Sequence, residues 1–200
     1  MVFRLLIVCT GNVCRSPMAA QLLRGRLGVL DGVEIMTAGT GALVGERMTA
    51  QAAAIARRLG ASEADVSEHR ARQLEPWMLR EVDLVLALAR SHRREILELE
   101  PSTTRRTFTL RELAHISRSE GGIRNGGAGD TDGSDERLRS GIARAAAFRG
   151  VVPPFVRVED ADVVDPYRRS DAVYEESAAQ IASAVDEVGR FLRGTVGVPA

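Results

Sequence analysis

The stretch Cys9-Thr-Gly-Asn-Val-Cys-Arg-Ser-Pro17 decides the fold of this chain. An apolar run over residues 3–8 leads into it and predicts a buried strand, and a helical pattern from Met18 to about Gly28 follows it. A loop between a strand and a helix can turn its backbone N–H groups inward, at the positive end of the helix, and so bind an anion. The stretch therefore predicts a phosphate-binding loop after the first strand of an α/β fold.

The side chains of this loop are those of a nucleophilic centre. Cys9 is expected at the floor of the loop, where the helix end and Arg15 favour the thiolate over the thiol. Arg15 can offer two parallel N–H donors to a tetrahedral oxyanion. Ser16 can donate to the Cys9 sulfur and is predicted as the N-cap of the helix, which places Pro17 at the first helical position.

Composition sets the class of protein. The chain has 200 residues, 44% of them hydrophobic, which suits one compact domain over 1–200. The charges of the 27 basic and 27 acidic residues cancel to a formal net charge of zero, so neither a nucleic acid nor a membrane surface is an expected partner. No run approaches the ~18 apolar residues that cross a bilayer, and two cysteines suit a reducing compartment, so a cytoplasmic location is expected. The three histidines are scattered, which predicts no metal site.

Apolar runs and helical periodicity alternate along the chain. Further strands are predicted at 33–37, at 82–88 and around Phe108, which gives an open four-stranded parallel sheet with helices on both faces. Ligands of such sheets bind beyond the carboxyl ends of the strands. The helices are predicted at 49–59 with Thr49 as N-cap, at 75–80, at 91–99 with Ser91 as N-cap, at 110–116 and at 171–193.

The amino-acid composition changes at residue 117, and the region 117–160 is predicted to be an insertion. Residues 117–135 are rich in glycine and poor in apolar side chains, which predicts a flexible surface loop. Residues 138–148 have helical periodicity and predict an added helix. The insertion could be a passive decoration, a lid over the site or a surface for a partner.

The glycine-rich loop 39–45 is partly similar to dinucleotide-binding loops. Its spacing, Gly-x-Gly-x-x-x-Gly, follows a predicted strand, but no helix with a ribose-binding acid comes at the required distance. No cofactor is therefore expected.

Three stretches resemble the low-molecular-weight protein tyrosine phosphatases. They are the Cys9–Pro17 loop, the segment 67–72 (Ser-Glu-His-Arg-Ala-Arg) and the distal Asp165-Pro-Tyr167. The resemblance covers about 1–113 and 162–193. It implies that Cys9 is the nucleophile, that Arg15 binds the phosphate and that Asp165 is the general acid.

The resemblance also implies supporting roles. Leu43, where the family often has an aromatic side chain, and Tyr167 are expected to line the substrate cleft. His69 is expected to hold the loop asparagine, Asn12, in shape. The residues expected to bind the phosphate from the loop are Thr10, Gly11, Asn12, Val13, Cys14 and Ser16.

The implied activity is hydrolysis of phosphotyrosine monoesters through a phosphocysteine intermediate. The expected partner is a tyrosine-phosphorylated protein, and the chain itself is expected to be a monomer or a weak homodimer. Two alternatives stay open: an arsenate reductase that uses an external small thiol, and a module that binds phosphate without turnover. Cys14 could capture an oxidised Cys9 as a disulfide or could be a small packing residue.

Overall fold

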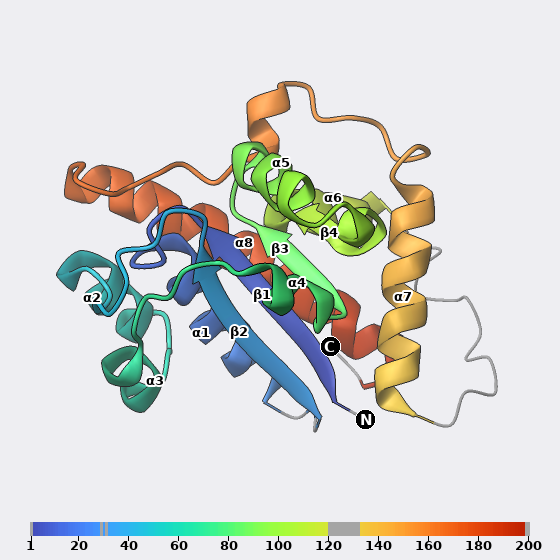
Figure 1. Ribbon diagram of the computed structural model, residues 1–200, viewed down its shortest axis with the longest axis horizontal. Helices are drawn as coiled ribbons and strands as arrows, with labels where there is room; N and C mark the ends of the chain where they lie inside the picture. Colours follow the sequence, from blue (N-terminus) through green and yellow to red (C-terminus); the bar gives the residue numbers. More distant parts are fainter. Residues whose placement is uncertain (1, 29, 31, 120–132, 199–200) are drawn as a thin grey trace.

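The computed structural model describes residues 2–28, 30, 32–119 and 133–198. Its centre is one sheet of four parallel strands in the order β2-β1-β3-β4 (Figure 1), which confirms the predicted fold class. The strands are β1 (Phe3–Cys9), β2 (Val33–Gly39), β3 (Leu84–Ala87) and β4 (Thr107–Thr109). β1 pairs with β2 on one side and with β3 on the other, so the loop that follows it leaves from the middle of the sheet.

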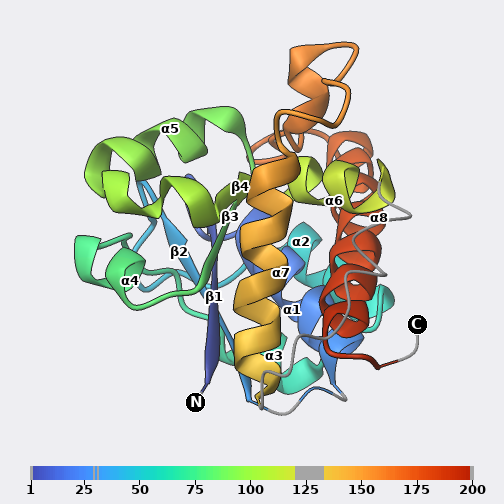
Figure 2. The same cartoon turned by 90° about the vertical axis from the view of Figure 1, so that its right-hand side faces the viewer.

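Helices cover both faces of the sheet (Figures 1 and 2). Helices α1, α2, α6, α7 and α8 pack their apolar side chains into one large core, whereas α4 and α5 cover the opposite face. The bounds are α1 (Arg15–Leu27), α2 (Ala50–Arg58), α3 (Glu63–Glu68), α4 (Pro76–Arg80), α5 (Arg90–Leu99), α6 (Leu110–Ser119), α7 (Ser134–Phe148) and α8 (Asp171–Thr195), with 3₁₀ helices η1 (Pro101–Arg106) and η3 (Val158–Ala161).

The central strand explains why both faces need cover. Side chains of a strand alternate between the two faces, and here Leu5 and Ile7 enter the large core while Leu6 and Val8 enter the smaller one. All four are fully buried. A strand of this kind reads as a continuous apolar run, as the sequence does over residues 3–8.

Two of the predicted helix starts are wrong. Helix α1 begins at Arg15 with Cys14 before it, so Ser16 is not its N-cap and Pro17 is the third helical residue. The Ser16 hydroxyl is instead turned inward, toward the Cys9 sulfur. Helix α5 begins at Arg90, so Ser91 lies inside it. By contrast, Thr49 caps α2 as predicted, since its side chain accepts a hydrogen bond from the N–H of Ala52.

The predicted insertion is described in part. Helix α6 continues to Ser119 and α7 begins at Ser134, so both ends of the predicted loop 117–135 are helical, and its centre, 120–132, lies outside the described residues. Helix α7 is longer than predicted, and its apolar residues Leu138 and Ile142 join the large core. The insertion boundaries remain a prediction. None of the helices within the described residues has both the length and the hydropathy needed to span a membrane.

Candidate active site

The loop after β1 and the segment before α8 meet at the carboxyl edge of the sheet. The Val163 N–H donates to the Leu88 carbonyl oxygen at 2.9 Å, which ties the second segment to the end of β3. A cavity of about 130 Å³ lies between them. It is lined by Cys9, Thr10, Gly11, Val13, Cys14, Arg15, Gly41, Leu43, Asp165 and Tyr167. All of these except Gly41 were named from the sequence.

The Cys9 thiol lies at the floor of this cavity and is 2% exposed. Its sulfur is 3.0 Å from the Ser16 hydroxyl oxygen and accepts a hydrogen bond from the Asn12 N–H at 3.3 Å. Among the described residues, the N–H groups of Gly11, Val13 and Cys14 donate to no protein acceptor. A sulfur held by donors beneath a set of free N–H groups is suited to attack an anion bound above it.

Asn12 fixes the shape of the loop from behind. It is completely buried and adopts a left-handed backbone conformation, with φ of 56°. Its side-chain NH₂ donates to the Ser16 hydroxyl at 2.8 Å, and its side-chain oxygen accepts from the Arg72 N–H at 2.9 Å. Asparagine tolerates this backbone conformation better than most residues. The amide thus links the loop to the chain segment that follows α3.

His69 also contacts Asn12, but through the main chain. Its Nε2 lies 2.7 Å from the Asn12 carbonyl oxygen, so Nε2 carries the proton and donates it. Burial lowers the pKa of His69 from 6.5, which favours the neutral ring. The sequence placed His69 beside the loop asparagine; the structure adds that the asparagine side chain finds its partners elsewhere.

Arg15 and Asp165 form an ion pair across the cavity. The Arg15 guanidinium is nearly buried, at 6% side-chain exposure; its Nη2 lies 2.9 Å from Asp165 Oδ2, and its Nη1 donates to the Val163 carbonyl oxygen at 3.3 Å. The Asp165 side chain is 54% exposed. The bond to the Val163 carbonyl oxygen therefore holds the guanidinium in place. The Asp165 carboxylate that it also binds is exposed at the mouth of the cavity and can move away from it.

Cys14 makes its contacts on the side of α2 and α8. Its sulfur is 3.3 Å from the Thr49 hydroxyl and 3.7 Å from the Tyr174 hydroxyl. Burial raises the pKa of the Cys14 thiol and raises that of Tyr174 to about 12, so both stay protonated at neutral pH. Cys9 and Cys14 are both free thiols.

His92 was not identified from the sequence. Its Nε2 lies 2.8 Å from the Thr10 hydroxyl, and the ring is 2% exposed. Burial, followed by the positive charge of Arg15, lowers the pKa of His92 from 6.5 to about 4. A signal was present, because His92 follows β3 closely and the carboxyl ends of parallel strands gather at the site.

Comparisons with known proteins agree with this arrangement. The model of the low molecular weight phosphotyrosine protein phosphatase family matches residues 4–146. A probable low molecular weight protein-tyrosine-phosphatase, EpsP, from Ralstonia solanacearum is 31% identical over 186 residues, 93% of each chain. A protein-arginine-phosphatase from Geobacillus stearothermophilus is 37% identical over 123 residues, which are 62% of this chain and 78% of that protein.

Solved structures give the same result. The crystal structure of a low molecular weight protein tyrosine phosphatase from T. tengcongensis aligns with a TM-score of 0.64 and 28% identity, covering 93% of this chain and 97% of that one. The two proteins therefore share the fold over nearly the whole of both chains. This chain therefore belongs to the low molecular weight phosphotyrosine protein phosphatase family.

Proposed function

We propose that this enzyme hydrolyses phosphotyrosine monoesters on proteins through a phosphocysteine intermediate. One observation carries the proposal: the buried Cys9 sulfur, the free N–H groups of its loop and the Arg15 guanidinium converge on one small cavity, with Asp165 at its mouth. A dianionic phosphate fits this set of donors, and a nucleophile lies beneath it. Such a site needs no metal to hold the phosphate.

The first step transfers the phosphoryl group to sulfur. The Cys9 thiolate attacks phosphorus, the S–P bond forms and the bond to the tyrosine oxygen breaks. Asp165 gives its proton to the leaving oxygen, which departs as tyrosine. The loop N–H groups and the Arg15 guanidinium hold the three equatorial oxygens, whose charge they stabilise in the transition state.

The second step returns the enzyme to its starting state. Asp165, now a carboxylate, takes a proton from water while the water oxygen attacks phosphorus. The S–P bond breaks, inorganic phosphate leaves and the thiolate is restored. The Ser16 hydroxyl, 3.0 Å from the sulfur, donates to the thiolate as it departs.

Substrate binding prepares the acid. The Asp165 carboxylate lies against Arg15 at 2.9 Å, on the guanidinium that a phosphate oxygen also requires. The incoming phosphate displaces the carboxylate from the guanidinium, and the carboxyl group of Asp165 is then free to contact the leaving oxygen. The same event therefore binds the substrate and places the acid.

The walls of the cavity favour an aryl phosphate over a phosphorylated guanidinium. Val13, Leu43 and Tyr167 offer apolar or aromatic surface beside the phosphate position. A phosphoarginine side chain carries several N–H donors, yet Asp165, which the mechanism assigns to the leaving group, is the only carboxylate among the lining residues. We therefore assign phosphotyrosine, although one relative is a protein-arginine-phosphatase. We place the reaction in the cytoplasm, where both cysteines stay reduced.

Asp165→Asn tests the mechanism through the leaving group. General acid catalysis is worth ~10²–10⁴-fold, but only where the leaving group needs a proton. We expect the variant to lose activity in this range on phenyl phosphate and far less on an electron-poor aryl phosphate. Asp160→Asn is the matched control, since Asp160 pairs with Arg157 at the surface and does not line the active-site cavity, so both rates should be unchanged. If Asp165→Asn lost activity equally on both esters, Asp165 would not be the general acid.

Substrate class is tested on one preparation. Matched peptides that carry phosphotyrosine or phosphoarginine are compared by kcat/KM, and arsenate reduction with small thiols is assayed in parallel. We expect phosphotyrosine to be preferred and arsenate reduction to be at background. Preference for the phosphoarginine peptide would overturn the assignment from the apolar walls, and phosphate binding without turnover of any ester would leave only a binding module.

A further inference from the structure

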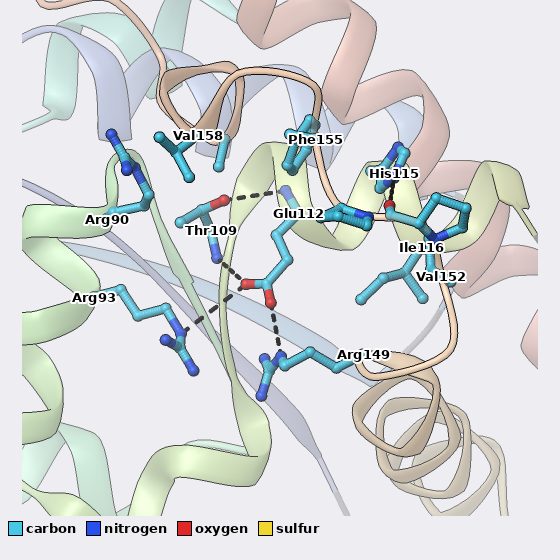
Figure 3. Close-up of a pocket in the computed structure, with 13 residues that line it drawn as sticks. Arg90, Arg93, Thr109, Glu112, His115, Ile116, Arg149, Val152, Phe155 and Val158 are labelled. Atoms are coloured by element: carbon cyan, nitrogen blue, oxygen red, sulfur yellow. Dashed lines mark hydrogen bonds and ion pairs between the residues drawn. The ribbon is translucent and has the colours of Figure 1, made fainter.

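A second cavity lies between α5, α6 and the segment that follows α7 (Figure 3). Its volume is about 290 Å³, more than twice the 130 Å³ of the active-site cavity, and the two share no lining residue. It is enclosed by α5, by the start of α6, and by residues 149–161, which lie in and just after the predicted insertion. Ligand pockets begin at about this size, ~300 Å³.

One wall of the cavity is cationic. Arg90 and Arg93, three residues apart on α5, and Arg149 all line it. Two carboxylates pair with them: Glu112 accepts from Arg149 Nε at 2.7 Å and lies 4.0 Å from Arg93, and Asp162 binds Arg90. Glu159 adds a further negative charge near Arg90, so neighbouring carboxylates offset most of the positive charge of this wall.

The free hydrogen-bond donors of this wall are centred on Arg93. Its Nε donates to the Thr107 carbonyl oxygen at 3.2 Å, but among the described residues its two terminal nitrogens make no hydrogen bond. Arg90 has one such nitrogen, Nη1, because its other two donors are taken by Asp162. By contrast, all three nitrogens of Arg149 donate to protein acceptors. The free donors therefore belong to α5.

Apolar side chains line much of the rest of the cavity. They belong to Val152, Pro153, Phe155 and Val158, and Figure 3 shows Val158 and Phe155 beside Thr109 and Glu112. The His115 ring stacks against Phe155 at 4.5 Å between ring centres and bonds the Pro153 carbonyl oxygen at 2.8 Å, which holds this part of the cavity in place. Half-buried N–H donors together with apolar side chains suit a ligand with a charged head and an apolar body.

We propose that this cavity is a second ligand site, which binds a small amphipathic monoanion such as an aryl carboxylate. The carboxylate accepts from the terminal nitrogens of Arg93, and the aromatic body packs against Phe155 and Val158. Because neighbouring carboxylates offset most of the positive charge of this wall, a monoanion fits better than the phosphate dianion that the loop after β1 holds in the proposed mechanism. The site is thereby distinct from the active site in both position and ligand class.

Isothermal titration of the full-length protein with 1-naphthylacetate tests the proposal, with neutral 1-naphthylacetamide as the matched probe. The titrations are run in saturating inorganic phosphate, which occupies the nucleophile loop. We expect the carboxylate to bind with one-to-one stoichiometry and at least about tenfold more tightly than the amide. Arg93→Gln should remove this preference, while Arg94→Gln, on the exposed side of the same helix at 75% side-chain exposure, should retain it.

A second pair of variants guards against a folding defect in Arg93→Gln. Val158 lines the cavity yet is 65% exposed, so Val158→Glu adds a carboxylate beside the arginines without disturbing the core. Val156→Glu makes the same change at a fully exposed position outside the cavity. We expect Val158→Glu to abolish binding and Val156→Glu to preserve it. Equal binding by the two variants, binding only in the absence of phosphate, or equal affinity for the two probes would each overturn the proposal.

Discussion

His92 should make the stability of this protein fall on mild acidification. The ring is 2% exposed, its Nε2 is engaged by Thr10, and among the described residues its Nδ1 has no partner. A protonated ring would need a second acceptor, and it would face the charge of Arg15, although Asp165 and Asp162 oppose that effect. Burial and Arg15 therefore lower the pKa of His92 from 6.5 in the unfolded chain to about 4 in the folded protein.

The sign and size follow from proton linkage. Between pH 6.5 and 4 the unfolded chain binds a proton at this position that the folded protein excludes, so stability falls as the pH falls. A shift from 6.5 to about 4 is worth at most ~3 kcal/mol, and between pH 7 and pH 5 it accounts for about 2 kcal/mol of lost stability. Above pH 6.5 the contribution is fully present.

The measurement is urea unfolding of wild type and His92→Gln at pH 7 and pH 5. The glutamine amide can reach Thr10 but does not titrate, so the variant isolates the ionisation from the hydrogen bond. We expect the wild type to lose about 2 kcal/mol more than the variant between the two pH values, with equal m-values. His69 and the carboxylates contribute to both proteins alike and cancel in the comparison. An identical pH dependence in the two proteins would refute the assignment of a lowered pKa to His92.

Three further predictions concern the nucleophile loop. A Cβ on Gly39 would lie 2.2 Å from the Thr10 carbonyl oxygen, so Gly39→Ala should cost about 3 kcal/mol in thermal unfolding, whereas Gly41→Ala, with 3.8 Å to its nearest neighbour, should cost little. Asn12→Ala removes a donor to Ser16 and leaves the Arg72 N–H without its acceptor, so it should cost about 2 kcal/mol and lower kcat; unchanged kcat would mean that the loop keeps its shape unaided. After peroxide treatment, Cys14→Ser should recover less activity with dithiothreitol than wild type; equal recovery would make Cys14 a packing residue.

Local patterns in the sequence predicted the frame of the site. The apolar run before Cys9 and the helical pattern after Arg15 fixed the strand, the loop and the helix, because each depends on neighbours in the chain. Asp165 was named from a motif, and the structure places it against Arg15. The catalytic roles assigned to these three residues remain predictions, since they rest on resemblance and on geometry.

Long-range contacts account for what the sequence left out. The prediction that Ser16 is the N-cap of α1 was wrong because the Ser16 hydroxyl contacts Cys9 and Asn12 instead. N-cap preferences describe a residue type and do not include partners elsewhere in the fold. The position of His92 after β3 indicates only that it lies near the carboxyl edge of the sheet; the contact of its ring with Thr10, 82 residues away, is long-range and has no signal in the local sequence. The arginine-lined second cavity forms only when the segment after α7 folds back over α5 and α6. No local sequence pattern predicts this long-range contact.

The distance along the chain between the two halves of the active site has a consequence for protein synthesis. Arg15 and Val163, which the structure joins by a hydrogen bond, are 148 residues apart. At a translation rate of ~5–20 residues per second, Arg15 leaves the ribosome roughly 7 to 30 seconds before Val163. For about the first half of that interval β1 also lacks β3, its neighbour on one side. A nascent or truncated chain thus presents the Cys9 thiol without Asp165, the acid of the proposed mechanism, and we expect full activity only when the segment before α8 has docked.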